Sequence, residues 1–101
     1  MRVLSWKPFG EFAVRHPAAE QPLRSWFKLL ERSPASNLAE LKQTFGSVDY
    51  VPVKQREIYV FNVGGNKYRV VSEINFKWRI AFIQCVLTHA EYDTGQWKRK
   101  L

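Results

Sequence analysis

Three side chains in the second half of the chain are of the kinds that move protons or hold phosphate: Arg69, His89 and Tyr92. His89 and Tyr92 stand three residues apart in THAEYD, so a helical turn places them on one face. Histidine exchanges protons near neutral pH, tyrosine donates or orients, and arginine steadies charge on a phosphorane-like transition state. These are the parts needed to cleave RNA through its own 2′-hydroxyl. Such a His–Tyr pair is also common in purely structural roles, and the residues alone leave both interpretations open.

The stretch FNVGGNKYRVV brings cations to one strand. The glycines at 64 and 65 predict a tight turn between two strands. Beyond the turn, side chains alternate between two faces: Tyr68, Val70, Ser72 and Ile74 on one, and Lys67, Arg69, Val71 and Glu73 on the other. If helices cover the first face, Lys67 and Arg69 point into an uncovered concavity. The alternative is that both are ordinary solvated residues of a half-exposed sheet.

The charge of the chain fits a polyanionic partner. There are 16 Lys and Arg against 9 Asp and Glu, a formal net charge of +7. Such a surface attracts nucleic acid first. An acidic protein or an anionic membrane surface could also use it, and some small basic proteins are merely soluble.

Other chemistries lack their motifs. One cysteine and two histidines have no zinc-site spacing, GGNK is not a Walker loop, and the carboxylates are scattered, so we expect no metal and no cofactor. IYVFNV resembles one stacking motif of an RRM, but the partner motif and the intervening helix are missing. No apolar run reaches the roughly 18 residues of a membrane span, and no signal-like segment opens the chain. We therefore expect a cytoplasmic protein, with Cys85 as buried filler.

Hydrophobic spacing predicts helices in the first half of the chain. Ser5 is the expected N-cap of a first helix, which ends at His16–Pro17 because a residue before proline avoids the helical region. A second helix begins near Glu20 and carries an apolar stripe opposite its charged side chains. Asn37 caps a short third helix, which Gly46 terminates.

Alternating and apolar runs predict strands in the second half. Residues 2–4 and SVDYVPV are expected edge strands, the latter because Pro52 breaks it. EIYVFNV and KYRVVSEI pair across the glycine turn, and RIAFIQCVL is apolar enough for a central strand buried on both faces. Thr88 and Glu91 have capping-box spacing for one helical turn, and WKRKL follows as a basic tail.

These elements predict one domain, residues 1–101, of the α+β class. Two to three N-terminal helices are expected to pack on one face of a small antiparallel sheet. The other face is expected to stay open, with a short helical turn at the C-terminal end.

YVFNVGGNKYRVV, FKWRIAFIQCVLTHAEYD and LKQTFGSVDYV together resemble the HigB-type toxins of bacterial toxin–antitoxin systems, which belong to the RelE-like superfamily of mRNA interferases. The resemblance is strong from Leu41 to Asp93 and looser over the helices. It implies a RelE-like fold and ribosome-dependent cleavage of mRNA in the decoding A site, by 2′-hydroxyl attack without a metal. It also implies a HigA-type helix-turn-helix antitoxin as partner, and operator DNA bound through the antitoxin complex.

The resemblance suggests a role for each side chain that could take part in the reaction or bind RNA. Arg69 matches the mid-strand arginine expected to contact the scissile phosphate. His89 matches a general base or acid, and Tyr92 a stacking or proton-donating group. The expected RNA contacts are cations of the turns and the C-terminal end: Lys67, Lys77, Arg79, Lys98, Arg99 and Lys100. RelE itself carries lysines on the preceding strand, where this chain has YVFNV, so the acid–base pair is not fixed.

Two other functions are compatible with the same residues. A non-catalytic module that binds RNA or an acidic protein would show salt-sensitive binding and no cleavage. A degenerate toxin would keep only antitoxin and DNA binding. The presence of every motif residue argues against the degenerate toxin.

Overall fold

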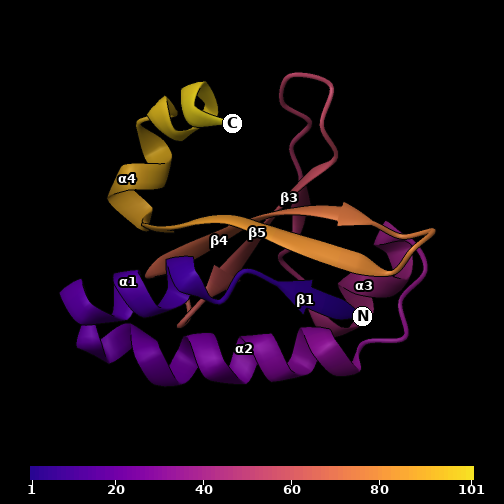
Figure 1. Ribbon diagram of the computed structural model, residues 1–101, viewed down its shortest axis with the longest axis horizontal. Helices are drawn as coiled ribbons and strands as arrows, with labels where there is room; N and C mark the ends of the chain where they lie inside the picture. Colours follow the sequence, from indigo (N-terminus) through magenta and orange to yellow (C-terminus); the bar gives the residue numbers. More distant parts are fainter.

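Five strands form one sheet, with helices on one side of it and the C-terminal segment on the other (Figure 1). The computed structural model describes all residues, 1–101. The helices are α1 (Lys7–Arg15), α2 (Glu20–Arg32), α3 (Leu38–Thr44) and α4 (His89–Asp93), with 3₁₀ helices η1 (Pro17–Ala19) and η2 (Gln96–Lys100). The strands are β1 (Arg2–Leu4), β2 (Asp49–Tyr50), β3 (Ile58–Val63), β4 (Tyr68–Asn75) and β5 (Ile80–Thr88). The predicted α+β class is confirmed.

The sheet has the order β1-β5-β4-β3-β2, which puts β4 in the middle. Strands β2 to β5 pair antiparallel, whereas β1 lies parallel to β5, so the sheet is mixed. The two expected edge strands, residues 2–4 and the run before Pro52, are confirmed, although β2 is only two residues long.

Most helix boundaries follow from local chemistry. His16 is the C-cap of α1, α2 begins at Glu20, and the Asn37 side chain accepts a hydrogen bond from the Glu40 backbone N–H at 2.9 Å, as predicted. The expectation that Ser5 caps α1 is wrong. The chain turns sharply between β1 and α1, which puts Ser5 in the left-handed region with φ 74° and makes Trp6 the N-cap.

The main core lies between the helices and one face of the sheet. Val70 and Ile74 of β4 are buried there, as the alternation predicted, and Tyr68 packs edge-on against Phe12 of α1. The largest fully buried helix side chains in this layer are Phe9, Phe12, Leu23, Leu30 and Leu41. Removing this apolar area from water holds α1, α2 and α3 on the sheet.

The opposite face of the sheet is not open, contrary to our expectation. Ile58, Val60 and Val71 form a second apolar cluster there, and Trp97 of η2 covers them with only 5% of its surface exposed. Gly95 takes a left-handed φ of 72°, which turns the chain after α4 back over the sheet. Figure 1 shows this C-terminal segment above the strands, on the side away from α1 and α2.

The expectation that β5 is buried on both faces is also wrong. Ala81, Ile83 and Val86 are buried against the helices, but Phe82 on the other face is 39% exposed. The pairing with β4 shifts between Val71 and Ser72, and this bulge leaves Gln84 without an opposite residue. The extra residue keeps Val86 on the helix face, where strict alternation would have placed its neighbour.

Candidate functional site

Arg69 lies on β4 next to the glycine turn and is almost buried, with 7% of its surface exposed. Its guanidinium donates hydrogen bonds to the backbone carbonyls of Asn66 at 3.2 Å and Tyr68 at 3.1 Å, and to the Asn66 side-chain oxygen at 2.7 Å. The predicted face is therefore right, but the predicted concavity is wrong. Arg69 sits under the C-terminal cover, because Trp97 and its neighbours fill that side.

Tyr92 contacts Arg69 directly. The guanidinium carbon lies 5.6 Å from the centre of the phenol ring, within the range of a cation–π contact. The same ring stacks on Trp97, with centroids 5.3 Å apart and planes 19° from parallel. Burial raises the pKa of the Tyr92 phenol, the charges of Asp49 and Asp93 raise it further, and Arg69 opposes them. Tyr92 therefore keeps its proton at neutral pH.

His89 opens α4 at the end of β5. A capping box fixes this helix start: Thr88 Oγ1 accepts from the Glu91 backbone N–H at 3.1 Å, and a Glu91 carboxylate oxygen accepts from the Thr88 N–H at 2.9 Å. The predicted capping box is thus confirmed. The His89 side chain is 45% exposed, and its Nε2 lies 3.3 Å from Asp93 Oδ2. Water and a ligand can reach this imidazole, and Asp93 restricts its orientation.

The glycine turn and α4 meet at this end of the sheet. The His89 backbone N–H donates to the Lys67 carbonyl at 2.9 Å. Lys67 itself belongs to the turn and is exposed, because β4 begins only at Tyr68; its predicted place beside Arg69 on the strand is wrong. The structure thus gathers Lys67, Arg69, His89 and Tyr92 around one corner.

The C-terminal cations are exposed on η2 and not on a free tail. Lys98, Arg99 and Lys100 flank the buried Trp97, and Lys54 Nζ donates to the carbonyls of Arg99 at 3.0 Å and Leu101 at 3.4 Å. A cavity of about 490 Å³ lies between β5, α4 and η2. Arg15 and Lys100 bring positive charge to its lining, and Glu91 brings one negative charge.

Lys77 and Arg79 lie at the opposite end of the sheet, in the turn between β4 and β5. Asn75 lies six residue steps along β4 from Arg69, a span of ~20 Å. Arg79 there donates to the Ser33 carbonyl at 3.3 Å. The structure therefore does not bring these two cations to the corner that holds Arg69 and Tyr92.

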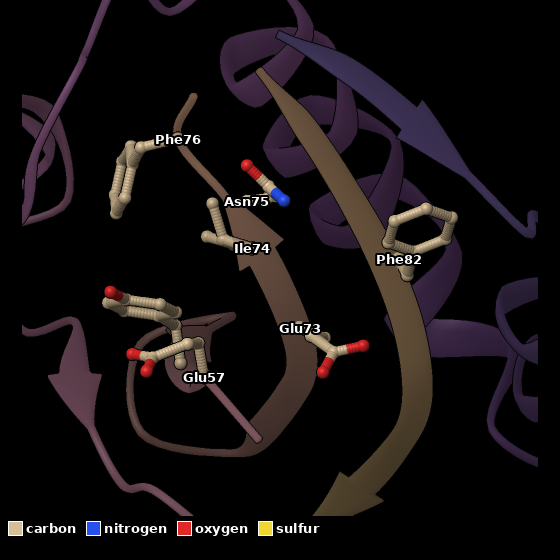
Figure 2. Close-up of a pocket in the computed structure, with 7 residues that line it drawn as sticks. Glu57, Glu73, Ile74, Asn75, Phe76 and Phe82 are labelled. Atoms are coloured by element: carbon tan, nitrogen blue, oxygen red, sulfur yellow. The ribbon is translucent and has the colours of Figure 1, made fainter. Parts of the chain in front are cut away.

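A second cavity, of about 450 Å³, opens near that far end (Figure 2). Glu57 and Glu73 line it together with aromatic side chains, among them Phe76 and Phe82. Two carboxylates repel a phosphate, so this cavity does not suit an RNA backbone. None of the sequence-predicted site residues lines it.

Neither metal nor membrane features are found. No group of three or more His, Cys, Asp or Glu side chains is arranged to hold a metal ion. None of the helices is both long and apolar enough to cross a bilayer. Cys85 is partly buried, and burial raises the pKa of its thiol to about 11, so it is protonated at neutral pH.

Four residues that shape this corner were not predicted from the sequence: Asn66, Asp93, Trp97 and Lys54. The spacing of His89 and Asp93, four apart in a helical segment, was a usable local signal. The others act through contacts that cross the sheet or the turn, which periodicity does not reveal.

Comparison with known proteins identifies the family of this chain. Residues 19–95 match the family model described as HigB_toxin, the RelE-like toxic component of a toxin–antitoxin system. The mRNA interferase HigB of Escherichia coli O6:H1 (strain CFT073) is 32% identical over 93 residues, which cover 92% of this chain and 89% of that protein. The mRNA interferase toxin HigB of Escherichia coli K12 is 31% identical, over 92% of this chain and 88% of that protein. The chain therefore belongs to the HigB family of RelE-like toxins from toxin–antitoxin systems.

Proposed function

We propose that this chain is a toxin that cleaves translated mRNA on the ribosome, through attack by the RNA's own 2′-hydroxyl. The family and the names of the relatives support cleavage of mRNA. The single observation that carries the assignment of the site is the burial of Arg69 without a charged partner. It is almost buried, and its three hydrogen-bond acceptors, supplied by Asn66 and Tyr68, are all uncharged.

A buried cation without a counter-ion favours an anion nearby. No carboxylate pairs with Arg69, although the molecule contains three other ion pairs between a lysine or arginine and a glutamate. Its guanidinium has five N–H donors, and three hydrogen bonds are made inside the protein. Two donors and an unbalanced charge remain, which suits the non-bridging oxygens of a scissile phosphate beside Tyr92.

His89 and Tyr92 take different parts in the proposed reaction. His89 removes the 2′-hydroxyl proton, and the 2′-oxygen attacks phosphorus. The bond to the 5′-oxygen breaks, and that oxygen takes a proton from water. The hydroxide left behind takes the proton held by His89, and the products are a 2′,3′-cyclic phosphate and a 5′-hydroxyl end. The raised pKa of Tyr92 makes it a poor proton-transfer acid, so it serves as a stacking surface and hydrogen-bond donor.

The exposed cations surround this corner and the far turn. Lys67 lies in the glycine turn before Arg69, and Lys98, Arg99 and Lys100 lie on η2 over the covered face of the sheet. We assign all four to phosphates of the message and of ribosomal RNA. Lys77 and Arg79 would contact a separate part of the RNA, at the other end of the sheet.

The proposed partner is a HigA-type antitoxin with a helix-turn-helix domain, whose complex with the toxin binds operator DNA. Membership of a toxin–antitoxin family supports a neutralising partner. The proposed place of action is the cytoplasm, where ribosomes are. We expect a gene for such an antitoxin beside the gene of this chain. Co-expression of that antitoxin should restore growth, and a purified complex of the two proteins should retard operator DNA on a gel.

The test of the enzyme is induced expression in bacteria with mapping of mRNA 5′ ends. The wild type should arrest growth and create new 5′-hydroxyl ends in translated messages. His89→Ala and Arg69→Ala should each lower the number of new ends by roughly 10²-fold or more. Arg32→Ala is the matched control, because this exposed arginine lies on α2, across the sheet from the site. Persistent ends in a folded Arg69→Ala/His89→Ala double variant would remove these residues from the mechanism.

One observation favours a second function, that of a toxin that binds and blocks without cutting. Arg69 also holds the glycine turn together, and His89 already contacts Asp93, so both side chains have structural roles. In that case, growth arrest would occur without new 5′ ends. Soluble protein that causes neither arrest nor new ends would point to a degenerate toxin.

A further inference from the structure

Trp97 is the centre of the layer that covers the sheet near the proposed site. Its indole is 5% exposed and packs on Ile58, Val60 and Val71 of the sheet. Lys54 holds the residues after it by hydrogen bonds to the carbonyls of Arg99 and Leu101. The indole is therefore held in one position, by the sheet below it and by the loop before β3 beside it.

Tyr92 contacts Trp97 in two ways. Its ring stacks on the indole with centroids 5.3 Å apart, and its backbone carbonyl accepts a hydrogen bond from Trp97 Nε1 at 3.1 Å. The same ring contacts the Arg69 guanidinium at 5.6 Å. A continuous chain of contacts thus runs from the apolar side chains of the sheet through Trp97 and Tyr92 to Arg69.

The helix that carries Tyr92 does not hold it by itself. α4 has five residues and none of them is buried. Helices this short are marginal without tertiary packing. The capping box at Thr88 fixes only the start of α4, and Tyr92 lies near its end. This end of the helix is packed through the ring of Tyr92, which stacks on Trp97 and contacts Arg69.

We propose that Trp97 is a positioning residue for the RNA-cleaving site, which fixes the ring of Tyr92 and, through it, the guanidinium of Arg69. This inference rests on the proposed function, since it assigns Arg69 and Tyr92 to the reaction. Trp97 touches neither the substrate nor the reacting atoms in this proposal. It acts by keeping two groups in one geometry, where a misplacement of about 1 Å can cost roughly 10²-fold in rate.

Two substitutions separate positioning from simple support of the fold. Trp97→Leu and Trp97→Phe both place an apolar side chain where the indole lies, and both lose the indole N–H. Only phenylalanine can still stack on Tyr92. If Trp97 merely fills space, the two variants should cleave equally well. If it positions Tyr92, the leucine variant should be slower than the phenylalanine variant.

The assay is cleavage of a translated message in a reconstituted translation system, with kcat and KM measured separately. Trp97→Leu should lower kcat roughly tenfold or more with KM changed less than about twofold, and Trp97→Phe should stay within about threefold of wild type. Leu30→Ala is the control for general destabilisation, because Leu30 is buried under the opposite face of the sheet. Its folded fraction should cleave at the wild-type rate. Trp97→Met is the second variant if the leucine protein does not fold.

An absorbance titration of the Tyr92 phenol gives a second readout that does not depend on activity. Tyr92→Phe identifies its contribution to the spectrum. Burial is the main cause of the raised pKa of Tyr92, so this pKa should fall toward the ordinary tyrosine value in Trp97→Leu and stay raised in Trp97→Phe.

Equal rates and equal Tyr92 titrations in the two variants would overturn the inference. If Arg69→Ala and Tyr92→Phe both cleave like wild type in the same assay, the proposed roles of those residues fail instead. Loss of cleavage in Arg69→Ala beside normal cleavage in Trp97→Leu would leave the function standing and remove only the role of Trp97.

Discussion

The glycine turn before β4 offers a matched pair of substitutions, Gly64→Ala and Gly65→Ala. Both glycines have left-handed backbones, with φ of 65° and 68°. A Cβ on Gly65 would meet nothing within 4 Å, whereas a Cβ on Gly64 would lie 3.0 Å and 3.2 Å from two ring carbons of Tyr68. The two variants therefore share the cost of the backbone and differ in one contact.

The backbone cost is about 1–2 kcal/mol for a residue with a Cβ in this region. Alanine also restricts the unfolded chain, which offsets about 0.4–1 kcal/mol. Gly65→Ala should thus lower the free energy of unfolding by about 1 kcal/mol. Gly64→Ala adds an overpacked contact of about 1–3 kcal/mol, because Tyr68 is held edge-on against Phe12 and has little room to move.

Thermal unfolding followed by circular dichroism measures the difference. For a domain of this size, 1 kcal/mol shifts Tm by about 4–8 °C. Gly65→Ala should lower Tm by about 5 °C and Gly64→Ala by roughly two to four times as much. Equal losses in the two variants, or a larger loss for Gly65→Ala, would refute the assignment of the close contact to Tyr68.

Three further predictions concern the cap of α3, the hold on the chain end and the buried thiol. Asn37→Ala should lower the free energy of unfolding by about 1 kcal/mol in urea titrations, because the Glu40 N–H loses its acceptor, and Asn37→Asp should lose much less. Lys54→Met should cost less than about 1 kcal/mol, since its hydrogen bonds are exposed, but should speed removal of the C-terminal residues by carboxypeptidase. Burial raises the pKa of Cys85 from 9.0 to about 11, so the thiol's contribution to stability is full below pH 9 and is lost as pH rises toward 11. Partial exposure of the side chain limits this contribution to about 1–2 kcal/mol. When urea unfolding is measured at each pH, the free energy of unfolding should fall less between pH 8 and pH 11 in Cys85→Ala than in wild type.

Local chemistry made much of the fold predictable from the sequence. The start of α2, the caps at Asn37 and Thr88 and the face of Val70 depend on near neighbours in the chain. The bulge in β5 was not predictable, because a nearly continuous apolar run hides the change of alternation at Gln84.

The covered face of the sheet was missed for a different reason. The sequence did contain a signal, since Val71 shares a face with Arg69 and an exposed sheet face rarely gathers large apolar side chains. The C-terminal WKRKL looked like a solvated tail because four of its five residues are charged or terminal. One buried tryptophan was enough to seat it, since an indole buries a large apolar area.

The positions of the site residues were predicted better than their environment. Arg69 and Tyr92 do meet, because strand alternation and the spacing within α4 are local properties. The contacts that decide their chemistry come from elsewhere: Asp49 raises the pKa of Tyr92 across the sheet, and Trp97 stacks from the covering segment. Sequence patterns do not order such contacts in space.

The covering segment also determines where positive charge gathers. Seating the indole of Trp97 on the sheet carries Lys98, Arg99 and Lys100 to the face under which Arg69 lies without a carboxylate partner. Like charges brought together this way repel, and the repulsion opposes the packing of this segment on the sheet. Salt screens exposed charges, so added salt should strengthen that packing in the free protein. A bound phosphate backbone would do the same more strongly, because it supplies the counter-ions in place. If Arg69 holds a phosphate of RNA as proposed, the same RNA should also stabilise the segment that covers Arg69.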